Sequence, residues 1–323
     1  MLKLTFVPKI KTYYYYEKKE QKVSLITAAS AKVKGFSELL ADFEKKISLS
    51  GKSESTFRNY SIHLAAMALY FECLPTELGS DEIDDYLYYL QQEHDTPSDS
   101  YFKHTVFGLR FVFKMRGLDE KRIKLPKLHH VKKLPVVLSR EEVKRLLKAP
   151  EMLKHRVLFG ILYGCGLRCF EARNIKLSNL DFDRKMLHVQ QGKGSKDRYV
   201  PLCDILIRGI KTYIAQEKPN VWLFNGKPGE RAGGDFDNRY SNRSIQSAVK
   251  KAAKDAGIIK EMSVHTLRHT YATHLLEDGL DILSIQKLMG HTCIQSTLIY
   301  LHVARIMPKP TFSPMETLYQ GKK

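Results

Sequence analysis

The chain has 323 residues, 43% of them hydrophobic and 27% charged, which is typical of a folded protein large enough for two domains. Lys and Arg number 53 against 35 Asp and Glu, giving a formal charge of +18. This excess predicts a polyanionic partner, because Lys and Arg displace counterions from phosphate. The longest apolar stretch, near Val157–Leu162, is too short to span a bilayer, and no signal peptide or basic amphipathic anchor is evident.

An N-terminal extension, residues 1–35, precedes a helical segment, residues 36–120. The run Tyr13–Tyr16 in the extension fits a strand, a flexible arm or both. In the helical segment apolar residues recur at every third or fourth position, which is typical of amphipathic helices. The expected helices are, in order, 36–48, a helix capped by Ser53 or Ser55, a helix after Ser80, and 98–115.

Basic residues gather on the fourth of these helices and on the segment that follows it. On the helix they lie opposite the core stripe, and a face of one sign favours phosphate contact over simple solvation. The segment 121–137 has prolines and little apolar periodicity, so it predicts an extended linker lying along a phosphate backbone. The candidate DNA contacts are Lys103, Arg110, Lys114, Lys121, Arg122, Lys124, Lys127, Lys132 and Lys133.

A second domain, residues 138–305, begins at a capping box formed by Ser139 and Glu142. Two short strands flank a Gly-rich turn at 192–195, which predicts a β-hairpin. In the remainder of this domain, glycines occur at positions where they can end helices, and residues 225–240 are predicted to form a loop. The expected elements are helices near 153–163, from 168, and over 205–216, 243–256, 266–278 and 282–289, with strands over 185–190 and 197–202.

The C-terminal tail, residues 306–323, carries a second capping box at Ser313–Glu316. The helix that this box opens is too short to be stable alone in water. We therefore expect it to dock on another surface through Met315, Leu318 and Tyr319.

Six residues could together break and rejoin a phosphodiester without a metal. Tyr300 supplies a phenol as nucleophile, because its proton is lost more readily than that of an alkyl alcohol. Arg168 and Arg268 can each direct two N–H donors to the phosphate, and Lys193 in its turn can protonate the leaving 5′ oxygen. His265 and His291 can bind the phosphate or move the tyrosine proton.

Each of these residues has an ordinary structural interpretation when taken alone. Arg168 can pair with Glu171, Lys193 can be solvent-exposed, and His265 can cap a helix. The spacing of His265 and His269 could suggest a zinc site, but the residue after His265 is not the glutamate that a zinc protease needs, and no third ligand stands out. The spacing of Cys165 and Cys169 could also hold a metal, but no second Cys or His pair with zinc-site spacing follows closely. The five scattered cysteines indicate reduced thiols in a cytoplasmic protein, so we expect neither a metal nor a disulfide frame.

The order and spacing of these residues over roughly 36–305 resemble those of the tyrosine recombinase (phage integrase) family. Residues 1–35 look short for an arm-binding domain, which favours an Xer-like or transposon-encoded two-domain type. Between the two hairpin lysines the role is assigned to Lys193, with Lys196 as the fallback. The matching segments are Gly166-Leu167-Arg168 with Glu171, Gly192-Lys193-Gly194-Ser195-Lys196, His265-Thr266-Leu267-Arg268-His269, Leu288-Met289-Gly290-His291, and Tyr300 nine residues after His291.

The resemblance implies a mainly α fold with a small antiparallel β-sheet in the second domain. It implies a helical, SAM-like core-binding domain and an α+β catalytic domain that together clamp a DNA duplex. The implied reaction is site-specific cleavage and rejoining of DNA through a 3′-phosphotyrosyl link, without ATP, metal or other cofactor. The implied assembly is a homotetramer on DNA, with the C-terminal helix docked in trans, in a cytoplasmic, nucleoid-associated protein that binds no membrane.

Three alternatives stay open at this point. A type IB topoisomerase uses a similar set of residues but relaxes supercoils as a monomer. A relative that has lost its activity would bind DNA without cutting it. A metal-dependent nuclease or transposase would need clustered carboxylates, which the second domain does not visibly offer.

Overall fold

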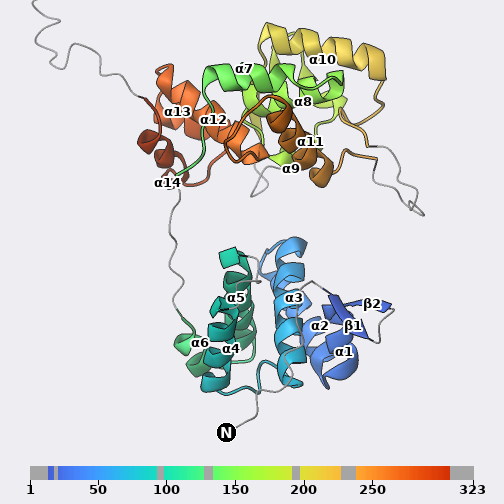
Figure 1. Ribbon diagram of the computed structural model, residues 1–323, viewed down its shortest axis with the longest axis vertical. Coiled ribbons are helices and arrows are strands. Elements are labelled where there is room, and N and C mark those ends of the chain that lie inside the picture. Colours follow the sequence, from blue (N-terminus) through green and yellow to red (C-terminus); the bar gives the residue numbers. More distant parts are fainter. Residues whose placement is uncertain are drawn as a thin grey trace, which may run out of the picture. The chain divides into compact units, whose positions relative to one another are not determined.

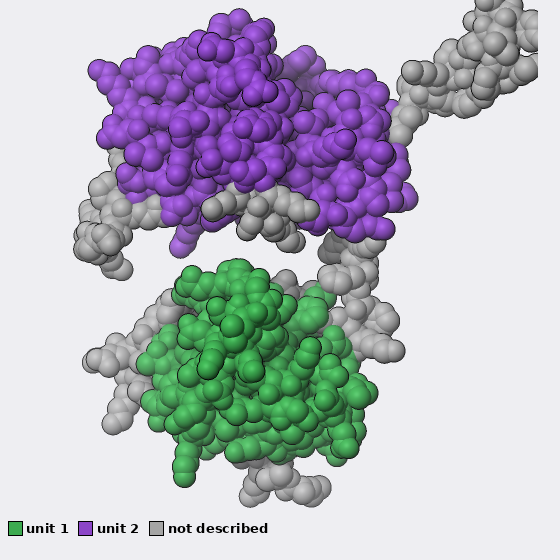
Figure 2. All heavy atoms as spheres, turned by 180° about the vertical axis from the view of Figure 1, so that it is seen from behind, with its two compact units in different colours: residues 1–131 green, residues 132–323 purple. Residues whose placement is uncertain are grey.

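The computed structural model describes residues 14–17, 21–92, 98–126, 134–190, 197–226 and 238–305. The chain forms two compact units, residues 1–131 and 132–323 (Figure 2). Within the described residues, none of the helices combines the length and the apolar character needed to cross a membrane. Several predicted features lie outside the described residues, namely Lys127, Lys132, Lys133, Lys193, Lys196 and the tail 306–323.

The first unit is a helical bundle built around one long central helix, α3 (Figure 1). Helices α1, α2 and α5 all pack against α3, whose small residues Ala65, Ala66 and Ala68 are buried and allow close approach. All four helices expected in residues 36–120 are present. The elements of this unit are β1 Tyr14–Glu17, β2 Gln21–Ser24, α1 Leu25–Lys32, α2 Phe36–Leu49, α3 Glu54–Phe71, α4 Ser80–Gln92, α5 Ser98–Met115 and α6 Asp119–Lys124.

The N-terminal extension contributes to the core of this unit, which the sequence did not predict. Strands β1 and β2 pair in antiparallel register, and helix α1 follows directly, capped by the Ser24 side chain. Leu25, Ala29 and Val33 are buried against the bundle. The helix escaped prediction because it has only eight residues and its small apolar side chains form no clear stripe.

The prediction of an extended linker beginning at residue 121 was wrong for its first four residues. They form the end of helix α6, which begins at Asp119 and packs against α5. The Lys121 ammonium donates hydrogen bonds to the carbonyl oxygens of Thr76 (2.9 Å) and Leu78 (2.8 Å), and the Leu125 side chain is buried. These contacts stabilise a helix that is too short to form alone.

The His63 imidazole lies inside this bundle and makes the stability of the protein sensitive to acid. It is 3% exposed, its ring meets that of Tyr101 edge-on at 4.1 Å, and His104 lies 5.5 Å away. Burial, followed by the charge of His104, lowers the pKa of His63 from 6.5 to about 4. The His63 imidazole therefore binds a proton more readily in the unfolded chain than in the folded one. The contribution of the neutral His63 ring to the free energy of unfolding is complete above pH 6.5 and is lost as pH falls toward 4.

We expect the free energy of unfolding to fall by about 2 kcal/mol between pH 7.5 and 5 on account of this one group. Urea unfolding of wild type and His63→Leu at both pH values checks the prediction, since the variant should lack this part of the pH dependence. The matched control is His302→Leu, because His302 is exposed. An identical pH dependence in wild type and His63→Leu would contradict the assignment.

The second unit packs helices around α8, which contacts α7, α9, α10 and α12 (Figure 1). The predicted capping box is confirmed, since the Ser139 Oγ accepts from the Glu142 N–H and the Glu142 carboxylate accepts from the Ser139 N–H. The helices are α7 Arg140–Lys148, α8 Leu153–Gly164, α9 Cys169–Arg173, α10 Asp204–Glu217, α11 Asn242–Asp255, α12 Val264–Glu277, α13 Ile282–Met289 and α14 Gln295–Leu298, with 3-10 turns η2 Leu177–Asn179 and η3 Ile299–His302.

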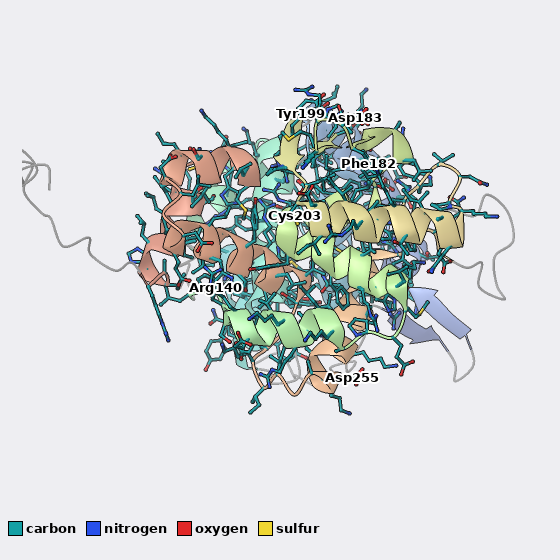
Figure 3. The ribbon with its side chains drawn as sticks, turned by 90° about the horizontal axis from the view of Figure 1, so that it is seen from above. Arg140, Phe182, Asp183, Tyr199, Cys203 and Asp255 are labelled. Carbon is teal, nitrogen blue, oxygen red and sulfur yellow. The ribbon has the colours of Figure 1, made fainter. Side chains whose placement is uncertain are left out.

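A three-stranded antiparallel sheet of order β3-β4-β5 lies beside these helices. It joins β3 Leu180–Asp181, β4 Met186–Val189 and β5 Arg198–Pro201, and Leu187 and Val200 face each other in the core. In Figure 3, Phe182 and Tyr199 mark the sheet, and the Lys211 ammonium of α10 lies 5.1 Å above the Phe182 ring. The mainly α fold with a small antiparallel sheet in the second domain is confirmed. The strand β3 was missed, because two residues show no periodicity.

Candidate active site

Helix α12 places three polar side chains on one face, at positions i, i+3 and i+4. Ser263 caps the helix and fixes its start, so that His265, Arg268 and His269 fall within its first two turns. The side chain of Arg268 is buried, that of His269 is half-buried, and that of His265 is exposed. The short 3-10 turn η3 packs against α12 and carries Tyr300.

Three arginines surround one buried carboxylate, that of Glu171. The Arg198 guanidinium binds it with two parallel hydrogen bonds of 2.9 and 2.8 Å, and the Arg168 guanidinium donates a third of 2.8 Å. The Arg168 backbone N–H also donates to Glu171, and the Arg268 Nη1 lies 3.8 Å from the same carboxylate. One negative charge therefore holds three positive charges in place, which leaves a net positive charge at this site.

Burial and the neighbouring arginines shift the pKa values of both Glu171 and Arg268. Burial alone would raise the pKa of the Glu171 carboxyl, but the hydrogen bonds and charges of Arg198 and Arg168 outweigh it and lower the pKa to about 2. Burial, followed by the charge of Arg168, lowers the pKa of Arg268 to about 10. Both groups therefore remain ionised at neutral pH.

The Arg268 guanidinium is held by backbone carbonyls as well as by charge. Its side chain is 4% exposed, its Nη1 donates to the Gly166 oxygen at 2.5 Å, and its Nη2 donates to the Met289 oxygen. The loop that follows α8 and the last residue of α13 therefore fix the orientation of this side chain. Glycine suits position 166 for two reasons. Its φ of +60° is in the left-handed region, and its backbone lies so close to the Tyr271 ring that a Cβ atom would overlap the ring.

We expect Gly166→Ala to destabilise the protein by about 2–5 kcal/mol, since the new methyl group overlaps the Tyr271 ring and the left-handed backbone disfavours alanine. Gly257→Ala is the matched control, because Gly257 has a similar φ of +65° and none of the described atoms lies within 4 Å of the added carbon. That control should lose only about 1 kcal/mol. Thermal unfolding measures both, and equal losses would contradict the close approach at Gly166.

Tyr300 is 1% exposed and lies between two imidazoles of its own subunit. Its Oη is 3.2 Å from the Nδ1 of His269, and its ring stacks on that of His291 at 6.4 Å between centroids. The His291 Nδ1 is in turn 2.9 Å from the Thr297 Oγ1, so helix α14 helps to orient that ring. The nucleophile expected from the sequence therefore lies beside Arg268 and both neighbouring histidines.

The imidazoles of this site, those of His265, His269 and His291, are neutral at physiological pH. Burial, followed by nearby positive charge, lowers the pKa of both His269 and His291 to about 4. Surrounding protein atoms, then the charges of Arg268 and Arg168, also lower the pKa of His265. Burial raises the pKa of the Tyr300 phenol, while the same two arginines oppose that shift, so the phenol keeps its proton.

The structure brings together five of the six residues singled out in the sequence: Arg168, His265, Arg268, His291 and Tyr300. Lys193 belongs to the segment 191–196, outside the described residues. Sequence reasoning missed Arg198. It considered Glu171 as a structural partner of Arg168 and as part of the motif at Gly166-Leu167-Arg168, but gave it no role at the site. It considered His269 as a zinc ligand and as the last residue of the His265-Thr266-Leu267-Arg268-His269 motif, without a role in the reaction, although its i+4 spacing from His265 already placed both on one face of a helix. The described residues contain no cluster of three or more side chains able to hold a metal.

Three of the expected DNA contacts of the first unit, Arg110, Lys114 and Arg122, line a groove of about 490 Å³ between α3, α5 and α6. Its walls combine basic and aromatic side chains, namely Lys52, Tyr60, Phe107, Arg110, Phe111, Lys114 and Arg122. Two of the basic groups already have internal partners, since Arg110 donates to the Pro126 oxygen and Arg122 pairs with Asp119. Lys114 and Lys124 are exposed, while Lys103 is half-buried on α5.

Comparison with known proteins places both units in one family. Residues 136–306 match the family model described as Phage integrase family, and residues 39–119 match its N-terminal SAM-like domain. The tyrosine recombinase XerA of Thermococcus onnurineus is 35% identical over 84% of this chain and 93% of its own length. A tyrosine recombinase of Thermosipho africanus is 31% identical over 78% of this chain and 90% of its own length.

Two solved structures share the fold. The XerH site-specific recombinase bound to its difH substrate has a TM-score of 0.61 and 19% identity, covering 91% of this chain and 92% of its own. The Tn1549 transposon integrase in complex with a circular intermediate DNA has a TM-score of 0.63 and 16% identity, covering 87% of this chain and 98% of its own.

Proposed function

The chain belongs to the phage integrase family of tyrosine recombinases, and from that membership we propose that it cuts and rejoins DNA strands at specific sites. The observation that carries the proposal is the position of Tyr300, whose Oη hydrogen-bonds to His269, whose ring lies beside that of His291, and whose pKa is influenced by the nearby charges of Arg268 and Arg168. A phenol among fixed guanidinium groups can attack a phosphodiester that those groups neutralise.

Each side chain has a role in the proposed reaction. Arg168 and Arg268 bind the non-bridging oxygens of the scissile phosphate, and His265 and His291 hydrogen-bond to it. The Tyr300 oxygen bonds to phosphorus, giving a 3′-phosphotyrosyl link and a free 5′ hydroxyl. Lys193 protonates the leaving oxygen.

Double-stranded DNA is the proposed partner of both units. In this proposal residues 36–120 form the core-binding domain, 138–305 form the catalytic domain, and the basic residues of α5, α6 and the linker contact phosphates. Active protomers form a homotetramer on two sites, and the tail helix after Ser313 docks on the neighbouring subunit. We place the protein in the cytoplasm, on chromosomal or mobile-element DNA.

The function is tested by incubating the protein, in EDTA, with plasmids that carry one or two copies of the target site and measuring strand exchange. We expect strand exchange only between paired sites, and a steep loss of affinity with added salt. A type IB topoisomerase would relax plasmids that carry no site, and an inactive relative would bind without cutting. Loss of activity in EDTA, or a flat response to salt, would contradict the proposal.

The proposed role of Lys193 predicts a specific chemical rescue. Lys193→Ala should slow cleavage of an ordinary duplex by about 10²–10⁴-fold, because a general acid contributes that much. A 5′-phosphorothiolate at the scissile bond supplies a leaving group that needs no proton, so the variant should cleave it at nearly the wild-type rate. Single-turnover cleavage of both duplexes measures this, with Lys196→Ala as the matched control. Equal losses on both duplexes would contradict the role.

A further inference from the structure

One histidine of the candidate active site, His269, has no part in the roles proposed above. His269 follows His265 by one helical turn on α12, and its Nδ1 lies 3.2 Å from the Oη of Tyr300. The two rings are 5.8 Å apart between centroids and inclined at 53°. His269 therefore touches the atom that forms the bond to phosphorus in the proposed reaction.

The other two imidazoles are placed differently. The Nδ1 of His291 is already hydrogen-bonded to Thr297, and its ring lies nearly parallel to the phenol at 17°. His265 is exposed, and its ring is 6.4 Å from that of His269. Among these three imidazoles, the hydrogen bond to the phenol found in the described part of the chain comes from His269.

We propose that His269 is the base that accepts the Tyr300 proton during strand cleavage, an inference that rests on the proposed function of the site. As the Oη–P bond forms, the Oη–H bond breaks and its proton moves to Nδ1. The P–O5′ bond breaks, and the leaving oxygen takes its proton from Lys193. In the rejoining step both transfers reverse, so the imidazolium returns its proton to the departing phenolate.

The surroundings of His269 keep its imidazole neutral before the transfer. The charged and titratable groups that face it are His265 and Arg268 on the same helix, His291 after α13, and Tyr300 on η3. Burial, then the charges of His265 and Arg268, lower the pKa of His269 to about 4, so the ring is neutral at neutral pH, and in the tautomer with its proton on Nε2 the Nδ1 accepts the hydrogen bond from the phenol. An entering phosphate adds negative charge nearby, which favours the imidazolium formed during the transfer.

The role is tested with His269→Ala and His269→Gln in single-turnover cleavage of a nicked suicide duplex in EDTA, between about pH 6 and 9. Both variants should cleave about 10²–10⁴ times more slowly than wild type while binding DNA equally well. In the Ala variant the cleavage rate should rise about tenfold for each unit of increasing pH, because the phenol must ionise without a base. Added imidazole should restore part of the lost cleavage rate.

The Gln variant separates a base from a residue that merely positions the phenol. Its amide keeps a hydrogen bond to Oη but cannot accept a proton, so a positioning role would leave the rate within about threefold of wild type. That result, with an unchanged pH profile, overturns the proposal even if the Ala variant fails to fold. His302→Ala, an exposed histidine on the same turn, is the control and should cleave normally. A wild-type protein that forms no adduct would instead refute the proposed function.

Discussion

Tyr300→Phe should reduce formation of the covalent protein–DNA adduct to background while leaving DNA affinity unchanged. The substitution removes one oxygen and keeps a ring that is 1% exposed and packed in the core, so the basic surface is not disturbed. The lost hydrogen bond to His269 should change the free energy of unfolding by only about 1 kcal/mol. A nicked suicide duplex in EDTA, resolved on a denaturing gel, measures the adduct.

Tyr163→Phe is the matched control for this experiment. The Tyr163 phenol also hydrogen-bonds to an imidazole of α12, at 2.9 Å from the Nδ1 of His274. Its removal is therefore a comparable structural change at a tyrosine with no proposed chemical role. The control should form adduct at the wild-type rate, and an adduct that persists in Tyr300→Phe would refute the identity of the nucleophile.

Glu171→Gln should destabilise the protein by about 3 kcal/mol and slow cleavage by about 10²-fold or more. The amide keeps the size of the carboxylate but no longer compensates the charges of Arg168, Arg198 and Arg268. Because the pKa of Glu171 is lowered from 4.5 to about 2, its contribution is complete above pH 4.5 and is lost as pH falls toward 2. Urea unfolding at neutral and acidic pH measures the effect.

Glu141→Gln is the corresponding control, since Glu141 is an exposed acid paired with Lys144 on the surface of α7. Its substitution should leave the urea midpoint and the cleavage rate unchanged. If Glu171→Gln were as stable as this control and cleaved normally, the buried carboxylate would not be organising the arginines.

The sequence predicted the long amphipathic elements well, because burial of one face leaves a period of 3.6 residues and a glycine often ends the helix. Helices α2, α5 and α13 lie where they were expected, and Gly290 ends α13 in the left-handed conformation. Elements stabilised by tertiary contacts left no such pattern. Helix α6, for example, is held by the Lys121 hydrogen bonds to carbonyls more than forty residues away.

At the candidate active site, too, residues that belong to a sequence motif could be predicted, and residues brought together only by tertiary contacts could not. Motif spacing indicated Arg168, Arg268, His291 and Tyr300 through resemblance to a family. Arg198 could not be predicted, because its partner Glu171 is 27 residues away and only the folded sheet brings them together. Nor could spacing tell which imidazole meets the phenol, since His265 and His269 share one face of α12 and differ only in depth of burial.

The most direct test of the account locates the bond between protein and DNA. Wild-type adduct trapped on a suicide duplex is digested with trypsin, which cuts after Lys287 and Arg305 and releases a peptide containing a single tyrosine, Tyr300. We predict that mass spectrometry will find the nucleotide on the oxygen of that tyrosine. A nucleotide on any other residue of the chain would contradict the account.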